Sequence, residues 1–148
     1  MRIERCRFEH LDGWSRLRSE LWPQRSAEDH RRGLAEALSL GGGDVAAVAA
    51  RADGGEIIGF AETTLRHDHV NGCETSPVVF LEAVYVAPAH RGRGAARALC
   101  AAVEAWGRSH GCRELAADAA AGDAASHRFH TAVGFEETGR VVFFRRVL

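Results

Sequence analysis

The sequence predicts a single mixed α/β domain, in which a central β-sheet is flanked by about four helices. Strand-like and helix-like patterns alternate along most of the chain. Residues 78–86 (VVFLEAVYV) are apolar on both faces, which is typical of a central strand. Residues 94–110 carry apolar side chains every three or four positions, as expected of a helix packed on a sheet. The length of 148 residues fits one domain, which we expect to span 1–148.

The remaining elements follow from periodicity and from turn residues. Residues 2–8 alternate as in a short strand, and residues 9–22 have helical spacing that Pro23 ends. Ser26 is positioned to cap a second helix at 27–40, which three glycines terminate. Further strands are expected at 45–50, 56–66 (with a bulge at Gly59), 112–118 and 140–147, and a further helix at 124–133.

Composition excludes several classes of function. The formal net charge is −1, and 19 scattered arginines are balanced by 20 acidic residues, so we expect no nucleic-acid partner. No apolar run approaches the ~20 residues that span a bilayer, and the first residues are charged, so no membrane association is expected. The four cysteines lack C-x-x-C spacing and the histidines do not cluster with them, so we expect no metal and a cytoplasmic protein with reduced thiols.

A glycine-rich turn follows the central strand, with the sequence Arg91-Gly92-Arg93-Gly94-Ala95-Ala96. The N-terminus of a helix offers free N–H groups, and glycines let a pyrophosphate approach them closely. The arginines add charge-assisted bonds to phosphate. The pattern matches neither a P-loop nor a dinucleotide fingerprint. Taken alone, it is also typical of an ordinary turn with solvated arginines.

In its setting, this segment resembles the Arg/Gln-x-x-Gly-x-Gly/Ala motif of the GCN5-related N-acetyltransferases (GNAT). A V-x-V-x-P strand at 84–88 precedes it, and His130-Thr131-Ala132-Val133-Gly134-Phe135 resembles the family's second signature. The resemblance implies a mixed β-sheet splayed between the fourth and fifth strands, with acetyl-CoA as co-substrate. The residues that it assigns to the co-substrate are Val84, Tyr85, Val86, Arg91, Gly92, Arg93, Gly94, Ala95, Ala96, Arg97 and Asp123, the last in place of an asparagine common in relatives.

Several unusual segments resemble one branch, the short dimeric aminoglycoside 6'-N-acetyltransferases. They are 21–23 (LWP), 66–73 (RHDHVNGC), 76–82 (SPVVFLE), 111–114 (GCRE) and 134–138 (GFEET). The resemblance implies transfer of an acetyl group from acetyl-CoA to the 6'-amino group of aminoglycosides, which confers resistance. It also implies a homodimer.

Glu82 and Asp118 are the candidate carboxylates for a polycationic acceptor. Glu82 interrupts an apolar strand, and a buried unpaired carboxylate is costly, so it must face a cavity or a partner. The alternative for Glu82 is pairing with a core arginine. Asp118 ends the neighbouring strand and is expected to face the same gap, although it could also cap the turn that follows.

Other acceptor contacts are expected from an aromatic face and from acidic groups. Trp22 is the candidate stacking face, whereas Trp14 and Trp106 have the helical phase of core residues. His69 stands where relatives carry a tyrosine in the substrate loop, and a solvated loop histidine is the alternative. The family borrows an acidic residue from the neighbouring subunit at a position that is Gly139 here, for which Glu136 or Glu137 would substitute.

The expected mechanism is direct attack of the free amine on the thioester. Glu82 is the first candidate to accept the amine proton and Asp118 the second. A backbone N–H near Val84 would stabilise the oxyanion. His130 occupies the position of a tyrosine that protonates the leaving thiolate in many relatives, and a packing role is the alternative. Two other functions stay open: a GNAT that acts on another amine such as a polyamine, and a non-catalytic acyl-CoA-binding module.

Overall fold

A computed structural model describes residues 1–148 and contains one five-stranded sheet in the order β1-β2-β3-β4-β5. The first four strands are antiparallel to their neighbours, and β5 runs parallel to β4. The mixed sheet that the sequence predicts is therefore confirmed. The strands are β1 (Arg2–Arg5), β2 (Val45–Arg51), β3 (Ile57–Arg66), β4 (Val78–Val86) and β5 (Leu115–Ala116).

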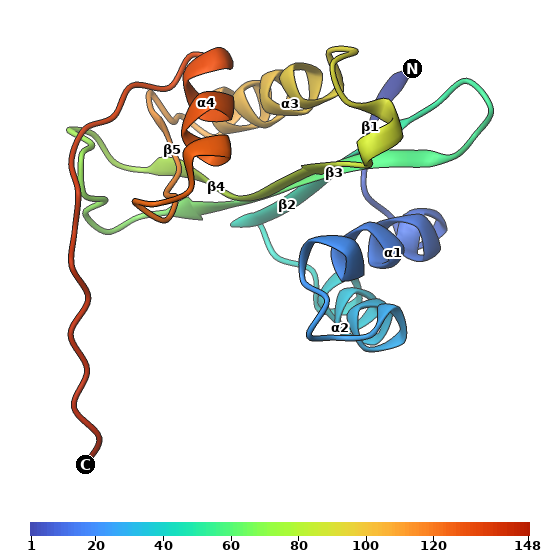
Figure 1. Cartoon of the computed structure of the whole chain (residues 1–148), viewed down its shortest axis with the longest axis horizontal. Helices are drawn as coiled ribbons and strands as arrows, with labels where there is room; N and C mark the ends of the chain where they lie inside the picture. The colour runs from blue at the N-terminus through green and yellow to red at the C-terminus, as the bar shows by residue number, and fades with distance from the viewer.

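Four α-helices cover the two faces of the sheet (Figure 1). On one face lie α1 (Leu11–Leu21), after the short 3-10 helix η1 (Phe8–His10), and α2 (Ala27–Leu40), which Ser26 caps by accepting from the Asp29 N–H. On the other face lie α3 (Ala95–Ser109), after η2 (Pro88–His90), and α4 (Ala124–Ala132). Each face has its own apolar core, so the sheet is buried on both sides where helices cover it.

The helix α3 lies unusually close to the central strand. A Cβ atom at Gly107 would come within 2.6 Å of Val79 Cγ1, so only glycine permits this approach. Cys100 and Cys112 are buried on this face, at 2% and 6% exposed, and Trp14, an expected core residue, is 4% exposed on the opposite face. Trp106 is only half-buried, so its expected place in the core is confirmed in part.

Three strand predictions need correction. The strand expected at 2–8 ends at Arg5, because Phe8 already begins the 3-10 helix η1. The strand expected at 112–118 is reduced to Leu115–Ala116, the two residues that pair with β4. The strand expected at 140–147 is absent: Thr138 still lies against Gly72, and the residues after it leave the body of the molecule as an extended tail (Figure 1). Alternating apolar residues favour a strand, but a strand also needs a partner for its backbone groups. No strand of this chain provides one.

The bulge predicted at Gly59 lies one residue away. Gly59 pairs with Ala50, but the next pair joins Ile57 to Arg51, so Ile58 is the extra residue. No helix of the chain is both long and apolar enough to cross a membrane.

Candidate active site

The sheet opens between β4 and β5. The two strands pair at only two positions, Val79 with Leu115 and Phe80 with Ala116. Strand β4 continues for six more residues to Val86 without a strand on that side. The sheet is therefore splayed between its fourth and fifth strands, as the sequence predicts, and the free edge of 82–86 can pair with an extended ligand.

The turn between β4 and α3 presents a row of free donors. None of the N–H groups from Gly92 to Arg97 donates to a protein acceptor. Gly92 and Gly94 have φ angles of 72° and 83°, a conformation that favours glycine. Gly94 is also the N-cap of α3 and provides no side-chain cap. Free amides and the positive end of the helix dipole together suit a phosphate group, as expected from the sequence.

Three arginines, two in this turn and one in the first turn of α3, are held differently. Arg91 donates from Nε to the Val86 carbonyl at 2.9 Å and lies over the Tyr85 ring, which leaves its terminal nitrogens free. Arg93 is exposed and has no protein partner. Arg97 donates to the Ala132 carbonyl at 2.7 Å and so joins α3 to α4. Arg91 and Arg93 are thus the better candidates for phosphate, whereas Arg97 has a structural contact.

Glu82 is the extra residue of a β-bulge. Glu62 pairs with Ala83 and Thr63 with Leu81, so Glu82 has no partner on β3. Its side chain is 35% exposed, and its Oε1 accepts from the Thr64 hydroxyl at 2.6 Å and from Arg66 Nη2 at 3.0 Å. Glu82 is thus neither buried nor unpaired, which fits the expectation that it faces a cavity or a partner, and the bulge turns its side chain toward these partners. Its arginine partner is itself 40% exposed and is not a core residue.

A second carboxylate, Glu62, faces α1 on the same side of the sheet. Arg18 Nη1 lies 2.6 Å from each of its oxygens, and Trp14 Nε1 donates to it at 2.8 Å. Burial raises the pKa of the Glu62 carboxyl, because lost solvation outweighs the opposing charge of Arg18 and the hydrogen bonds. Sequence reasoning missed this residue. The signal was present, since Glu62 interrupts an apolar strand just as Glu82 does.

Arg18, which pairs with Glu62, also packs against Trp22. Trp22 follows α1 directly and is half-buried. The Arg18 guanidinium lies 4.7 Å from the Trp22 ring centroid, and the Phe60 ring lies 6.5 Å away. The side chain is therefore braced by the protein yet partly accessible, as a stacking face for a sugar ring requires.

The loop between β3 and β4 is anchored by Glu114, for which the sequence predicted no such role. The Glu114 carboxylate accepts from the Glu74 N–H at 2.9 Å, from the Thr75 N–H at 2.6 Å and from the Thr75 hydroxyl. These hydrogen bonds lower the pKa of Glu114, the Thr75 contacts most. His69 lies in this loop, exposed and without a hydrogen-bond partner.

The remaining candidate residues lie on or after β5. Asp118 is exposed two residues beyond β5 and accepts no hydrogen bond from the protein, so it does not cap the turn. Asp123 caps α4 by accepting from the Ser126 N–H at 3.0 Å. Glu136 is exposed, and Glu137 pairs with Arg140 at 2.6 Å, a contact that lowers the pKa of Glu137.

His130 is half-buried within α4 and is held by packing. Its Nδ1 donates to the Ser126 carbonyl at 2.8 Å, and its ring lies 5.2 Å from the rings of Phe129 and Phe135. Because Nδ1 carries the proton in the neutral ring, Nε2 is left with a free lone pair. This geometry supports the packing role and leaves one nitrogen for proton exchange.

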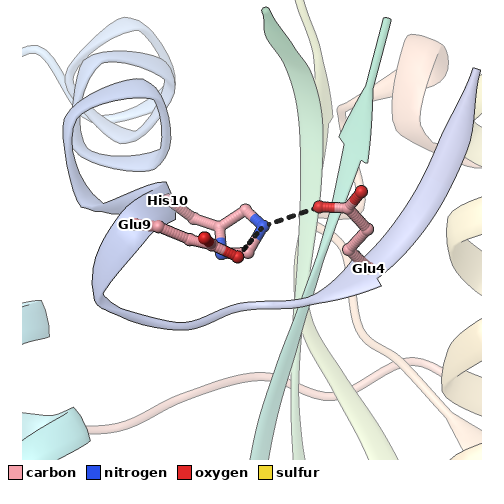
Figure 2. Close-up of side chains that lie close together, drawn as sticks. All are labelled: Glu4, Glu9 and His10. Atoms are coloured by element: carbon pink, nitrogen blue, oxygen red, sulfur yellow. Dashed lines mark hydrogen bonds and ion pairs between the residues drawn. The ribbon is translucent and has the colours of Figure 1, made fainter. Parts of the chain in front are cut away.

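One further polar cluster, Glu4, Glu9 and His10, joins β1 to the start of α1 (Figure 2). These groups lie close enough to surround a cation. The Arg7 N–H donates to His10 Nδ1 at 3.0 Å, so Nε2 carries the ring proton and donates to Glu4 at 3.0 Å. Neither ring nitrogen of the buried histidine then has a free lone pair for a metal. Arg51 completes the cluster by donating to Glu4 at 2.9 Å, so we interpret it as a structural link.

Comparison with known proteins agrees with this geometry. Residues 11–135 match the model of the Acetyltransferase (GNAT) family. The chain therefore belongs to the GNAT family. It is similar to the aminoglycoside N(6')-acetyltransferases type 1 of Salmonella typhimurium (46% identical, 99% of both chains) and of Stenotrophomonas maltophilia (53% identical, 91% of this chain and 86% of the relative).

Solved structures give the same result. One is AAC(6')-Iy in complex with the bisubstrate analogue CoA-S-monomethyl-acetylneamine, with a TM-score of 0.90 and 44% identity over 99% of this chain and 98% of that one. Another is AAC(6')-Ih from Acinetobacter baumannii, with a TM-score of 0.91 and 35% identity over 99% and 98% of the two chains. The predicted GNAT fold is confirmed.

Proposed function

We propose that the protein transfers the acetyl group of acetyl-CoA to the 6'-amino group of aminoglycosides and thereby confers resistance to them. One observation supports this proposal above all: the gap beside β4 runs from the free N–H groups of the turn before α3 to Glu82. A long phosphate-bearing ligand and a cationic acceptor can therefore meet at one point of the sheet. The names of the relatives, which cover nearly the whole chain, support the choice of acceptor.

The co-substrate site follows from the free backbone groups. The pantetheine arm would pair with the edge of Val84, Tyr85 and Val86, and the pyrophosphate would accept from the N–H groups of residues 92–97. Arg91 and Arg93 would add charge. We assign no direct contact to Asp123, because its carboxylate already caps α4.

The reaction needs one proton acceptor and one oxyanion donor. We assign the proton of the 6'-ammonium to Glu82, directly or through one water, with Asp118 as second candidate. The free amine then attacks the thioester carbonyl while the Val84 N–H stabilises the oxyanion. The C–S bond breaks, the acetylated nitrogen releases its remaining extra proton to solvent, and the thiolate takes a proton from solvent, or from His130 Nε2 when both nitrogens of that ring are protonated. Holding both substrates in line contributes a further part of the acceleration.

The acceptor would lie on the part of the sheet face that α1 and α2 leave open. Trp22 would stack on one sugar ring, and His69 and Asp118 would contact hydroxyl and amino groups. In the family, a neighbouring subunit adds an acidic group at the position of Gly139. Glu136, whose carboxylate has no protein partner, is the better replacement, because Glu137 already pairs with Arg140.

We also infer that the protein, a single N-acetyltransferase domain over 1–148, forms a homodimer. The tail exposes Val141, Val142, Phe143, Phe144, Val147 and Leu148, with Phe144 94% exposed. Such an apolar segment is covered in stable proteins, and a second copy is the occupant that the family resemblance favours. Light scattering should give twice the chain mass, and a chain ending at Gly139 should be monomeric. The four unpaired cysteines fit a cytoplasmic location.

The proposed activity is tested by following coenzyme A release from acetyl-CoA with kanamycin, tobramycin, amikacin or spermidine as acceptor. Turnover with the three aminoglycosides and none with a 6'-hydroxyl analogue would support both the acceptor class and the position. Turnover with spermidine alone would keep the enzyme class and reject the antibiotic. Tight acetyl-CoA binding without release for any amine would indicate a binding module.

A further inference from the structure

Arg66 occupies the place that an acceptor cation would take. Its guanidinium lies 3.0 Å from Glu82 Oε1 and 3.5 Å from the centroid of the Phe80 ring. A polycationic sugar would use a carboxylate and an aromatic face. Arg66 covers both. The contact rests on the bulge at Glu82 and on the position of Arg66 at the end of β3, so it is a product of the fold itself.

The contact between Arg66 and Glu82 is weak enough for a ligand to displace it. Arg66 makes no other side-chain hydrogen bond, and both partners are partly exposed. The Phe80 ring itself is buried, but the Arg66 guanidinium and Glu82 are partly exposed, so the ion pair and the cation–π contact are each weak. Together they would reduce the affinity of a competing cation about tenfold. Thr64 remains bonded to Glu82 at 2.6 Å when Arg66 leaves, so the carboxylate keeps one support.

We propose that Arg66 is a displaceable counter-cation of Glu82, which the acceptor's ammonium group replaces on binding and which returns after transfer. This inference rests on the proposed function and adds a residue that controls acceptor entry and product release. Acetylation converts the ammonium into a neutral amide, which has no charge to hold at Glu82. Once Glu82 has lost its proton again, Arg66 can recover the ion pair and favour departure of the product.

The direction in which the KM for the acceptor changes distinguishes a displaceable counter-cation from an arginine that only holds Glu82 in place. In Arg66→Gln the acceptor no longer competes with a cation, so we expect the KM for kanamycin to fall about tenfold. Inhibition by the 6'-N-acetylated product should strengthen by a similar factor. The KM for acetyl-CoA should not change. Arg66→Lys retains the charge and should stay within about threefold of the wild type in both constants.

Arg108→Gln is the matched control, because Arg108 pairs with Glu104 at the same distance of 3.0 Å on the outer side of α3. It should leave both constants unchanged. A kanamycin KM in Arg66→Gln that rises or stays unchanged would overturn the proposal, since support of Glu82 predicts weaker binding. An unchanged product inhibition constant would likewise contradict the return of Arg66. Absence of acceptor turnover in the wild type would instead reject the proposed function.

Discussion

Glu62 and Glu82 are two carboxylates on neighbouring strands and on the same face of the sheet, yet their surroundings differ. Glu62 is 15% exposed and bonded to Arg18 and Trp14 beneath α1. Glu82 is 35% exposed, lies on a bulge and meets Arg66 at the open part of the same face. The charge and the type of partner are the same. The difference arises because α1 covers Glu62 and leaves Glu82 accessible.

The covered carboxylate and the accessible one are expected to serve stability and function, respectively. A covered ion pair has no solvent to replace a lost partner, so its removal should destabilise the fold. An open ion pair contributes little to stability, and its carboxylate is available to a ligand. Where both kinds occur on one face, exposure distinguishes the candidate catalytic group better than residue type.

The largest effect on stability is expected from Glu62→Gln. This change leaves the Arg18 charge partly buried without a counter-charge, which should reduce the free energy of unfolding by about 3–5 kcal/mol. Denaturant unfolding followed by tryptophan fluorescence measures the loss. The double variant Arg18→Met, Glu62→Leu removes both charges and should recover most of it. A loss below about 1 kcal/mol in the single variant would mean that Glu62 behaves like an exposed group.

A smaller effect is expected on the opposite face of the sheet. Gly107→Ala places a methyl group within 2.6 Å of Val79 and should cost about 1–3 kcal/mol by overpacking. Gly33→Ala is the control, since its methyl group on α2 would meet nothing within 4 Å. That helix should gain about 0.5–1 kcal/mol. Equal melting temperatures for the two variants would show that α3 can move away from β4 at no cost.

The smallest effect is expected from a third carboxylate, Glu4. Hydrogen bonds from His10 and Arg51 lower the pKa of Glu4 from 4.5 to about 2. Because the folded-state pKa is lowered, this stabilisation is present above pH 4.5 and is lost as the pH falls toward 2. The difference in melting temperature between wild type and Glu4→Gln should therefore shrink between pH 6 and pH 3. Glu9→Gln, at an exposed position, should show no such trend.

The sequence predicted the elements whose signal is local. The apolar run of β4, the glycine turn and the amphipathic α3 each carry their own pattern, and the family motif fixes how they meet. Glu82 was identified because a charge within an apolar strand is visible in the sequence. Its exposure was not, since the bulge depends on how β3 and β4 align.

Non-local features were missed for the same reason. Arg66 is 16 residues from Glu82 in the chain, and Glu114 lies 39 residues beyond Thr75, so no periodic pattern joins them. The tail has the alternation of a strand, but nothing in this chain pairs with it. A pattern predicts which faces are apolar, whereas pairing depends on what lies opposite.

The most direct test of the functional assignment is Glu82→Gln, measured for both stability and turnover. The amide keeps the shape of the side chain and can still accept from Thr64, but it cannot take the amine proton. We expect the melting temperature to stay within about 2 °C, because an exposed ion pair contributes little. The KM for acetyl-CoA should not change, and kcat with kanamycin should fall about 100-fold or more. Unchanged turnover would contradict the assignment of Glu82 as the group that receives the proton.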